Sequence, residues 1–113
     1  MPKTIDIELG LELSGGNREL ADDLFYMLVK ELPEQLAVIE RYCDKHDKVS
    51  LQEAAHKLNG ATRYCGVPAL QDAIVLFDKV ARQGDDAAIA SHLDGPRKAI
   101  SELLDLSRDF KGH

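Results

Sequence analysis

The segment from Arg18 to Asp44 has the longest helical pattern in the chain and reads RELADDLFYMLVKELPEQLAVIERYCD. Its apolar side chains recur at steps of three and four residues, which is typical of one face of an amphipathic helix. Pro33 falls inside this pattern, yet the apolar stripe resumes on the same face after it. We therefore expect one long helix, kinked at Pro33 and capped by Asn17, rather than two helices. The stripe consists of Leu20, Leu24, Met27, Leu28, Leu32, Leu36, Ile39 and Cys43.

Most of the rest of the chain also has the apolar spacing and capping residues of helices. A short helical turn is expected over residues 6–13. The next long helix is capped by Asp47, and Gly66 is expected to end it in a left-handed conformation. A third long helix starts at Pro68 and ends at Gly84. The fourth starts at Asp85 or Asp86. Gly95-Pro96 interrupts its apolar stripe, which runs on to Phe110, so we expect a kink there, with a true break as the alternative.

No segment alternates apolar and polar residues with a period of two, so no strands are expected. Four amphipathic helices with short connections favour an all-α fold, an up-down-up-down antiparallel four-helix bundle with a short extra N-terminal helix. The length of 113 residues predicts a single domain over residues 1–113, with frayed ends at about 1–4 and 108–113.

Composition excludes several classes of function. The net charge is −6 and no run of Lys or Arg forms a basic patch, so nucleic acid is not an expected partner. No apolar run approaches the ~18 residues of a membrane span, so we expect no membrane contact by this domain. The two cysteines, Cys43 and Cys65, are too few and too far apart for a zinc ribbon. Without an export signal, they indicate reduced thiols in the cytosol.

The segment after Glu53 contains the candidate site. His56, Asn59, Gly60 and Arg63 are spaced to share one face of a helix, offset from the core stripe, so His56 is expected to be exposed. Glycine inside a helix costs about 1 kcal/mol relative to alanine. Gly60 therefore suggests that a partner protein or a phosphoryl group must come close to the imidazole. Lys57 and Arg63 would offset negative charge there.

Other interpretations of this segment stay open. A surface histidine beside a lysine is usually only solvated, and a glycine inside a helix can serve close helix packing. A di-metal carboxylate site needs two Glu-x-x-His motifs, and only Glu53-Ala-Ala-His56 is present, so no metal site is expected. A complete histidine kinase is excluded because the chain has no Gly-rich nucleotide-binding segment.

Together, His56-Lys57-Leu58-Asn59-Gly60, Gly66 and Leu70 resemble the signature of histidine-containing phosphotransfer (HPt) domains. The flanking segments Leu32-Pro33-Glu34 and Tyr64-Cys65-Gly66-Val67-Pro68 agree, and the resemblance extends over residues 4–106. It is most similar to the C-terminal HPt modules of hybrid sensor histidine kinases of the BarA/GacS type.

The resemblance implies a phosphorelay intermediate. His56 would accept a phosphoryl group from the aspartyl phosphate of one receiver domain and pass it to the aspartate of a response regulator. The domain would need no cofactor of its own, because the receiver supplies Mg²⁺, and it would have no autonomous kinase activity. It also implies a monomer in the cytoplasm, either alone or as the C-terminal domain of a membrane-bound sensor kinase. The alternative is a non-catalytic four-helix module that docks a receiver or kinase domain.

The resemblance also distributes roles among the neighbours of His56. A polar residue on the following helix often hydrogen-bonds the imidazole in this family, and that place falls on Asp78. With Lys57 and Arg82, Asp78 would orient the ring or stabilise the phosphoryl group, while Asn59, Gly60 and Arg63 would dock the receiver. The sequence has Asn59 where Lys or Arg is frequent, and Asp78 where Gln or Glu is usual. Asp78 and Arg82 could instead form an ordinary surface pair four residues apart.

Overall fold

Helices make up most of the computed structural model, which describes residues 3–108. No strand occurs in that range, which confirms the all-α prediction. None of the helices in it is long and apolar enough to cross a lipid bilayer. In chain order they are α1 (Ile7–Leu13), α2 (Arg18–Asp44), α3 (Lys48–Thr62), α4 (Pro68–Gln83), α5 (Asp86–His92) and α6 (Asp94–Ser107).

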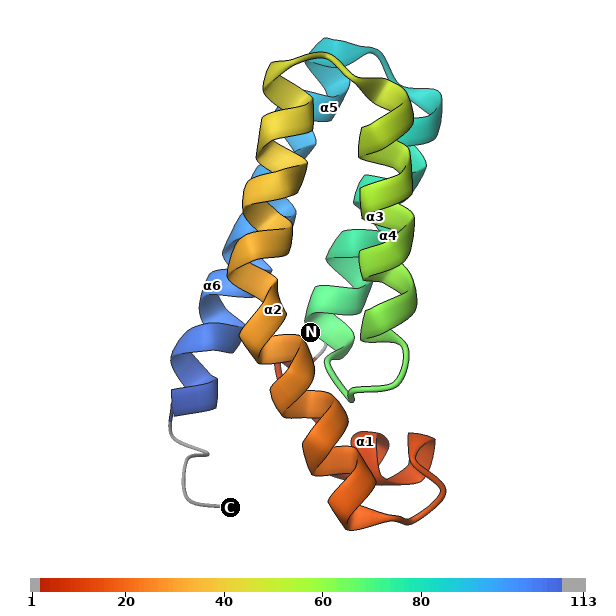
Figure 1. The fold of residues 1–113 in the computed structure, drawn as a ribbon, viewed down its shortest axis with the longest axis vertical. Coiled ribbons are helices and arrows are strands. Elements are labelled where there is room, and N and C mark those ends of the chain that lie inside the picture. Colours follow the sequence, from red (N-terminus) through yellow and green to blue (C-terminus); the bar gives the residue numbers. More distant parts are fainter. Residues whose placement is uncertain (1–2, 109–113) are drawn as a thin grey trace.

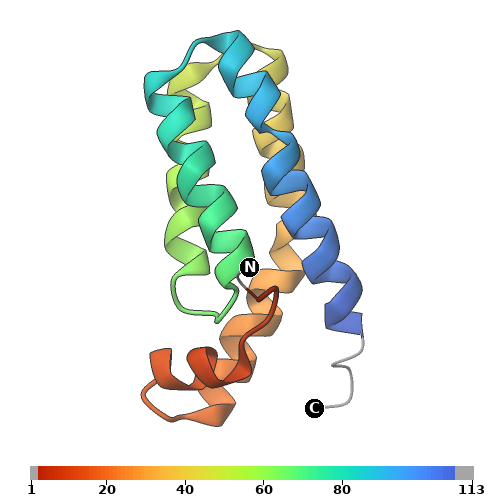
Figure 2. The same cartoon turned by 180° about the vertical axis from the view of Figure 1, so that it is seen from behind.

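The long helices run up and down beside one another as an antiparallel bundle about 41 Å long (Figure 1). α2, α3 and α4 are the first three helices of the bundle, and α5 and α6 together take the place of the fourth. The short α1 packs against the first part of α2, at the opposite end from α5 (Figure 2). α3 and α4 make the most extensive contact in the bundle, so they form the base on which the candidate site is built.

The core forms where the apolar stripes of the long helices meet. The prediction that the whole α2 stripe faces the core was wrong for two residues, because Leu20 and Met27 are 43% and 58% exposed. They lie in the first half of α2, which extends past the ends of α3 and α4 toward α1 (Figure 1). The largest fully buried apolar side chains are Leu32, Ile39, Leu51, Leu58, Val67, Leu70, Ile74, Phe77, Ile100 and Leu103.

The predicted helix starts are confirmed by their hydrogen bonds. The side chains of Asn17, Asp47 and Asp85 each accept from the backbone N–H three residues on, at 3.0, 3.1 and 2.8 Å. Such bonds satisfy N–H groups that have no partner within the helix. Pro68 occupies the first turn of α4 as expected. α2 continues through the exposed Pro33, and its ribbon bends between its lower and upper parts (Figure 1).

Two helix boundaries differ from the prediction. α3 ends at Thr62, so Gly66 lies in the following loop, although its φ of 63° is left-handed as expected. The fourth helix is broken at Leu93, the alternative that was left open, and the break falls before Gly95-Pro96. Pro96 sits in the first turn of α6, where a missing N–H removes no helical hydrogen bond.

Most of the ends that were expected to fray lie outside the described residues, namely 1–2 and 109–113, and Phe110 lies there too. The N-terminal part that is described is held in place, because the carbonyl of Lys3 accepts a hydrogen bond from the N–H of Ala69 at 3.0 Å.

Candidate functional site

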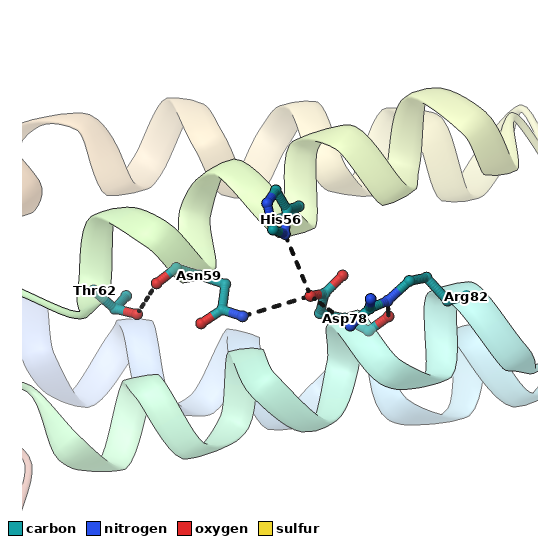
Figure 3. Close-up of polar contacts among 5 residues, drawn as sticks. All are labelled: His56, Asn59, Thr62, Asp78 and Arg82. Carbon is teal, nitrogen blue, oxygen red and sulfur yellow. Dashed lines mark hydrogen bonds and ion pairs between the residues drawn. The ribbon is translucent and has the colours of Figure 1, made fainter.

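His56 lies near the middle of α3, on the side that faces α4 (Figure 3). Its neighbours Ala55 and Leu58 are fully buried, and they fix the rotation of the helix. The imidazole consequently points away from the core, and the side chain is 77% exposed. The expected exposure of His56 is confirmed.

Asp78 of α4 lies beneath the imidazole, as expected from the sequence, and its side chain is only 2% exposed. Its Oδ2 is 3.9 Å from Nδ1 of His56. That distance is within the reach of an ion pair but too long for a hydrogen bond. Because Asp78 faces Nδ1, the other ring nitrogen, Nε2, is left for an incoming group.

Arg82 neutralises this buried carboxylate. Its NH2 group is 3.1 Å from Asp78 Oδ2, and its Nε donates to the backbone carbonyl of Asp78 at 3.5 Å. The Arg82 side chain is itself 58% exposed. The two residues are therefore not an ordinary surface pair, because the acidic partner is buried and would cost several kcal/mol if it were left without compensation.

The placement of Asn59 was wrong. The sequence put it on the exposed docking face, but the residue is only 6% exposed, and a buried side chain offers no surface to a partner. Its Nδ2 donates to Asp78 Oδ2 at 3.5 Å (Figure 3). One sequence signal could have found this: Asn59 is four residues after Ala55 and three before Thr62, both core positions, so all three share a helix face.

The other predicted residues lie at the rim. An added Cβ at Gly60 would meet no atom within 4 Å, so the helix surface is open beside His56. Arg63 is exposed at the end of α3. Lys57 lies on the opposite flank, where it lines a groove with Glu31 and Glu34 of α2. The structure thus gathers His56, Asn59, Asp78 and Arg82 together and leaves Lys57 apart from them.

Sequence reasoning did not single out Val75, an apolar residue that is 47% exposed. It precedes Asp78 by three residues and shares its helix face. Since α3 and α4 are antiparallel, the turn after His56 and the turn before Asp78 lie toward the same end of the pair (Figure 3). The turns that carry Gly60 and Val75 therefore lie toward the same end of the α3–α4 pair. The sequence signal that could have identified Val75 is an apolar side chain outside the core-facing stripe of α4.

The chain is similar to known proteins across most of its length. The Hpt domain family matches residues 23–110. A sensor histidine kinase GacS of Pseudomonas protegens is 37% identical over 101 residues, which is 89% of this chain and 11% of that protein. The signal transduction histidine-protein kinase BarA of Escherichia coli K12 is 32% identical over 81 residues, or 72% of this chain and 9% of that one. This chain thus spans about a tenth of the length of these relatives.

A solved structure has the same fold. The crystal structure of the HPT domain of a sensor hybrid histidine kinase from Shewanella superposes with a TM-score of 0.75. The two chains are 26% identical, and the match covers 96% of this chain and 97% of the other. The family match, the kinase relatives and the shared bundle lead to one conclusion: this chain belongs to the Hpt domain family, found in hybrid sensor kinases and used in the phosphorelays of two-component signalling.

Proposed function

We propose that His56 is the residue that carries the phosphoryl group. It would accept that group from the aspartyl phosphate of one receiver domain and pass it to the aspartate of another. The observation that supports this most directly is an exposed imidazole, 77% accessible, standing over a buried carboxylate that faces its Nδ1. No such arrangement is needed for a histidine that is merely solvated.

Phosphoryl transfer of this kind requires the protein mainly to position the imidazole and the phosphoryl group. The lone pair of Nε2 attacks phosphorus, the bond between phosphorus and the aspartyl oxygen breaks, and that oxygen leaves with the electron pair as a carboxylate. Nδ1 keeps its proton, which the charge of the Asp78 carboxylate 3.9 Å away would stabilise. Arg82 balances the charge of Asp78, and its exposed guanidinium would be available to meet a phosphoryl oxygen. Catalysis of this kind rests on orientation and charge stabilisation.

We further propose that the receiver docks over the open surface beside His56. Gly60 presents no side chain there, Val75 supplies exposed apolar area, and Arg63 supplies positive charge. The Mg²⁺ that accompanies aspartyl phosphate chemistry is assigned to the receiver and not to this chain. The kinase relatives support a cytoplasmic location for the domain.

The test is phosphorylation of the purified chain by a phosphorylated receiver. We expect the wild-type chain to acquire phosphate that is labile in acid and stable in base, and the His56→Gln variant to acquire none. His92→Gln is the matched control, since His92 is also exposed on a helix, and it should be labelled normally. Full labelling of His56→Gln would overturn the proposal. Receiver binding by the wild type without labelling would instead identify a non-catalytic docking module.

A further inference from the structure

We propose that Asn59 is a positioning residue, which holds the Asp78 carboxylate so that its Oδ2 faces Nδ1 of His56. This inference rests on the proposed role of His56 as the phosphoryl carrier. In this inference Asn59 acts on the buried Asp78 carboxylate. It replaces the docking role that the sequence position of Asn59 suggested.

The first support is the uneven use of the two carboxylate oxygens. Oδ2 of Asp78 is approached by Nδ2 of Asn59 at 3.5 Å, by NH2 of Arg82 at 3.1 Å and by Nδ1 of His56 at 3.9 Å. Within residues 3–108, Oδ1 of the same carboxylate is buried and has no hydrogen-bond partner. A buried oxygen without a partner is costly, so the carboxylate needs specific contacts to stay in this orientation.

The second support is the helix from which each contact comes. Arg82 lies on α4 with Asp78 and also binds its backbone carbonyl, so Arg82 follows any movement of that helix. Asn59 lies on α3, which carries His56. Its amide therefore ties the carboxylate to the same helix as the imidazole (Figure 3). Because a carboxylate oxygen can only accept, the group that Asn59 directs toward it must be the NH₂ and not the carbonyl.

The third support is the burial of Asn59. The residue is 6% exposed, so its side chain has no access to a docking partner. Within residues 3–108, its Oδ1 is buried without a hydrogen-bond partner, and its Nδ2 donates to Asp78. The amide is therefore used in the contact with the Asp78 carboxylate.

The chemical consequence concerns the tautomer of His56. A negative charge held 3.9 Å from Nδ1 favours the ring form with the proton on Nδ1, which leaves the lone pair of Nε2 free to attack phosphorus. Without the Asn59 amide, the carboxylate is free to turn toward Arg82 alone. The fraction of His56 in the Nδ1–H form should then fall, and the rate of phosphotransfer should fall with it.

The experiment compares variants by ¹⁵N NMR of the neutral His56 ring, together with the rate of phosphotransfer from a phosphorylated receiver. Asn59→Leu removes the amide while filling similar volume, and Asn59→Ala serves if the leucine does not fold. We expect a lower Nδ1–H fraction and a rate reduced roughly tenfold. Asn59→Gln, which keeps an amide donor, should recover part of both losses.

Gln52→Ala is the matched control. Gln52 also reaches from α3 to α4, where its Nε2 donates to the carbonyl of Ala81 at 3.1 Å, but it does not contact Asp78. This variant should leave the His56 tautomer unchanged. An unchanged tautomer in the Asn59 variants, or an equal change in Gln52→Ala, would overturn the inference. Neither result would affect the role of His56, which the His56→Gln experiment tests separately.

Discussion

In the proposed docking surface, Gly60 would serve the approach of the receiver and not the fold. A Cβ at this position would meet open space, and alanine is the better helix former by about 1 kcal/mol. Gly60→Ala should therefore keep or slightly raise the melting temperature. Gly60→Gln should also remain folded but slow phosphotransfer, because a long side chain would occupy the approach to His56.

Calorimetry and the labelling assay together check both statements. If Gly60→Gln unfolds the chain, the glycine is a packing residue, and the argument for clearance fails.

The two cations near His56 should differ in effect. Arg82 contacts the Asp78 carboxylate beneath the ring, whereas Lys57 lies on the other flank beside Glu31 and Glu34. A charge-assisted contact contributes about 1.5–3 kcal/mol, so Arg82→Ala should slow phosphotransfer roughly tenfold to hundredfold. Lys57→Ala should have a smaller effect.

Single-turnover labelling measures both rates. Arg82→Ala should also lower the melting temperature, since it leaves a buried carboxylate with less compensation. Arg82→Lys is the control that keeps the charge. Equal slowing by Lys57→Ala and Arg82→Ala would contradict the separation of the two cations.

The thiols provide a test that is independent of the site. Burial raises the pKa of the Cys65 thiol to about 11, and burial followed by the charge of Asp44 raises the pKa of Cys43. The thiolate is the reactive form, so the native chain should react slowly with a disulfide reagent at pH 8. Reactivity should rise as the pH rises toward the raised values, and both thiols should react rapidly in denaturant. Rapid labelling of native Cys65 at pH 8 would contradict its burial.

At the scale of elements, α1 docks through a contact between glycines. Gly66 has a φ of 63°, and a Cβ there would clash with the carbonyl oxygen of Asp6 and with the backbone of Gly10. In addition, the N–H of Asp6 donates to the carbonyl of Gly66 at 2.8 Å. The loop between α3 and α4 thus lies against the start of α1 with no room for a side chain.

Gly66→Ala should consequently lower the free energy of unfolding by about 2 kcal/mol or more, from backbone strain and displacement of α1. Gly15→Ala is a matched control: its φ is 68°, but nothing lies within 4 Å of the added Cβ, so it should cost only the backbone strain of about 1–2 kcal/mol. Urea denaturation of both variants measures the difference. Equal losses would show that α1 is not closely docked.

The elements also show what the sequence can predict. The caps at Asn17, Asp47 and Asp85 depend on residues three positions away, so local sequence is enough to find them. The exposure of Leu20 and the burial of Asn59 depend on where neighbouring helices end and how they are rotated. Both depend on tertiary structure, so the spacing of apolar residues within a single helix cannot predict them. The exposure of His56 was predictable because two core residues flank it.

At the scale of the whole molecule, the surface predicts a monomer. The exposed large apolar residues are distributed over different helices, among them Ile7 on α1, Val49 on α3 and Leu106 on α6. Scattered residues of this kind are ordinary on soluble monomers, and a net charge of −6 opposes self-association. Light scattering should give a mass near 12.5 kDa at all concentrations tested. A mass that rises with concentration would contradict this.

The polar contact between α3 and α4 has a consequence for alignment. A slip of one helical turn between α3 and α4 would move their side chains by about 5.4 Å relative to one another. Such a slip would leave the Asp78 carboxylate facing apolar side chains without the amide of Asn59, at a cost of several kcal/mol. The contact between Asn59 and Asp78 therefore also discriminates between registers of the two helices. Replacing both by leucine would tend to raise stability and at the same time weaken the selection of a single alignment.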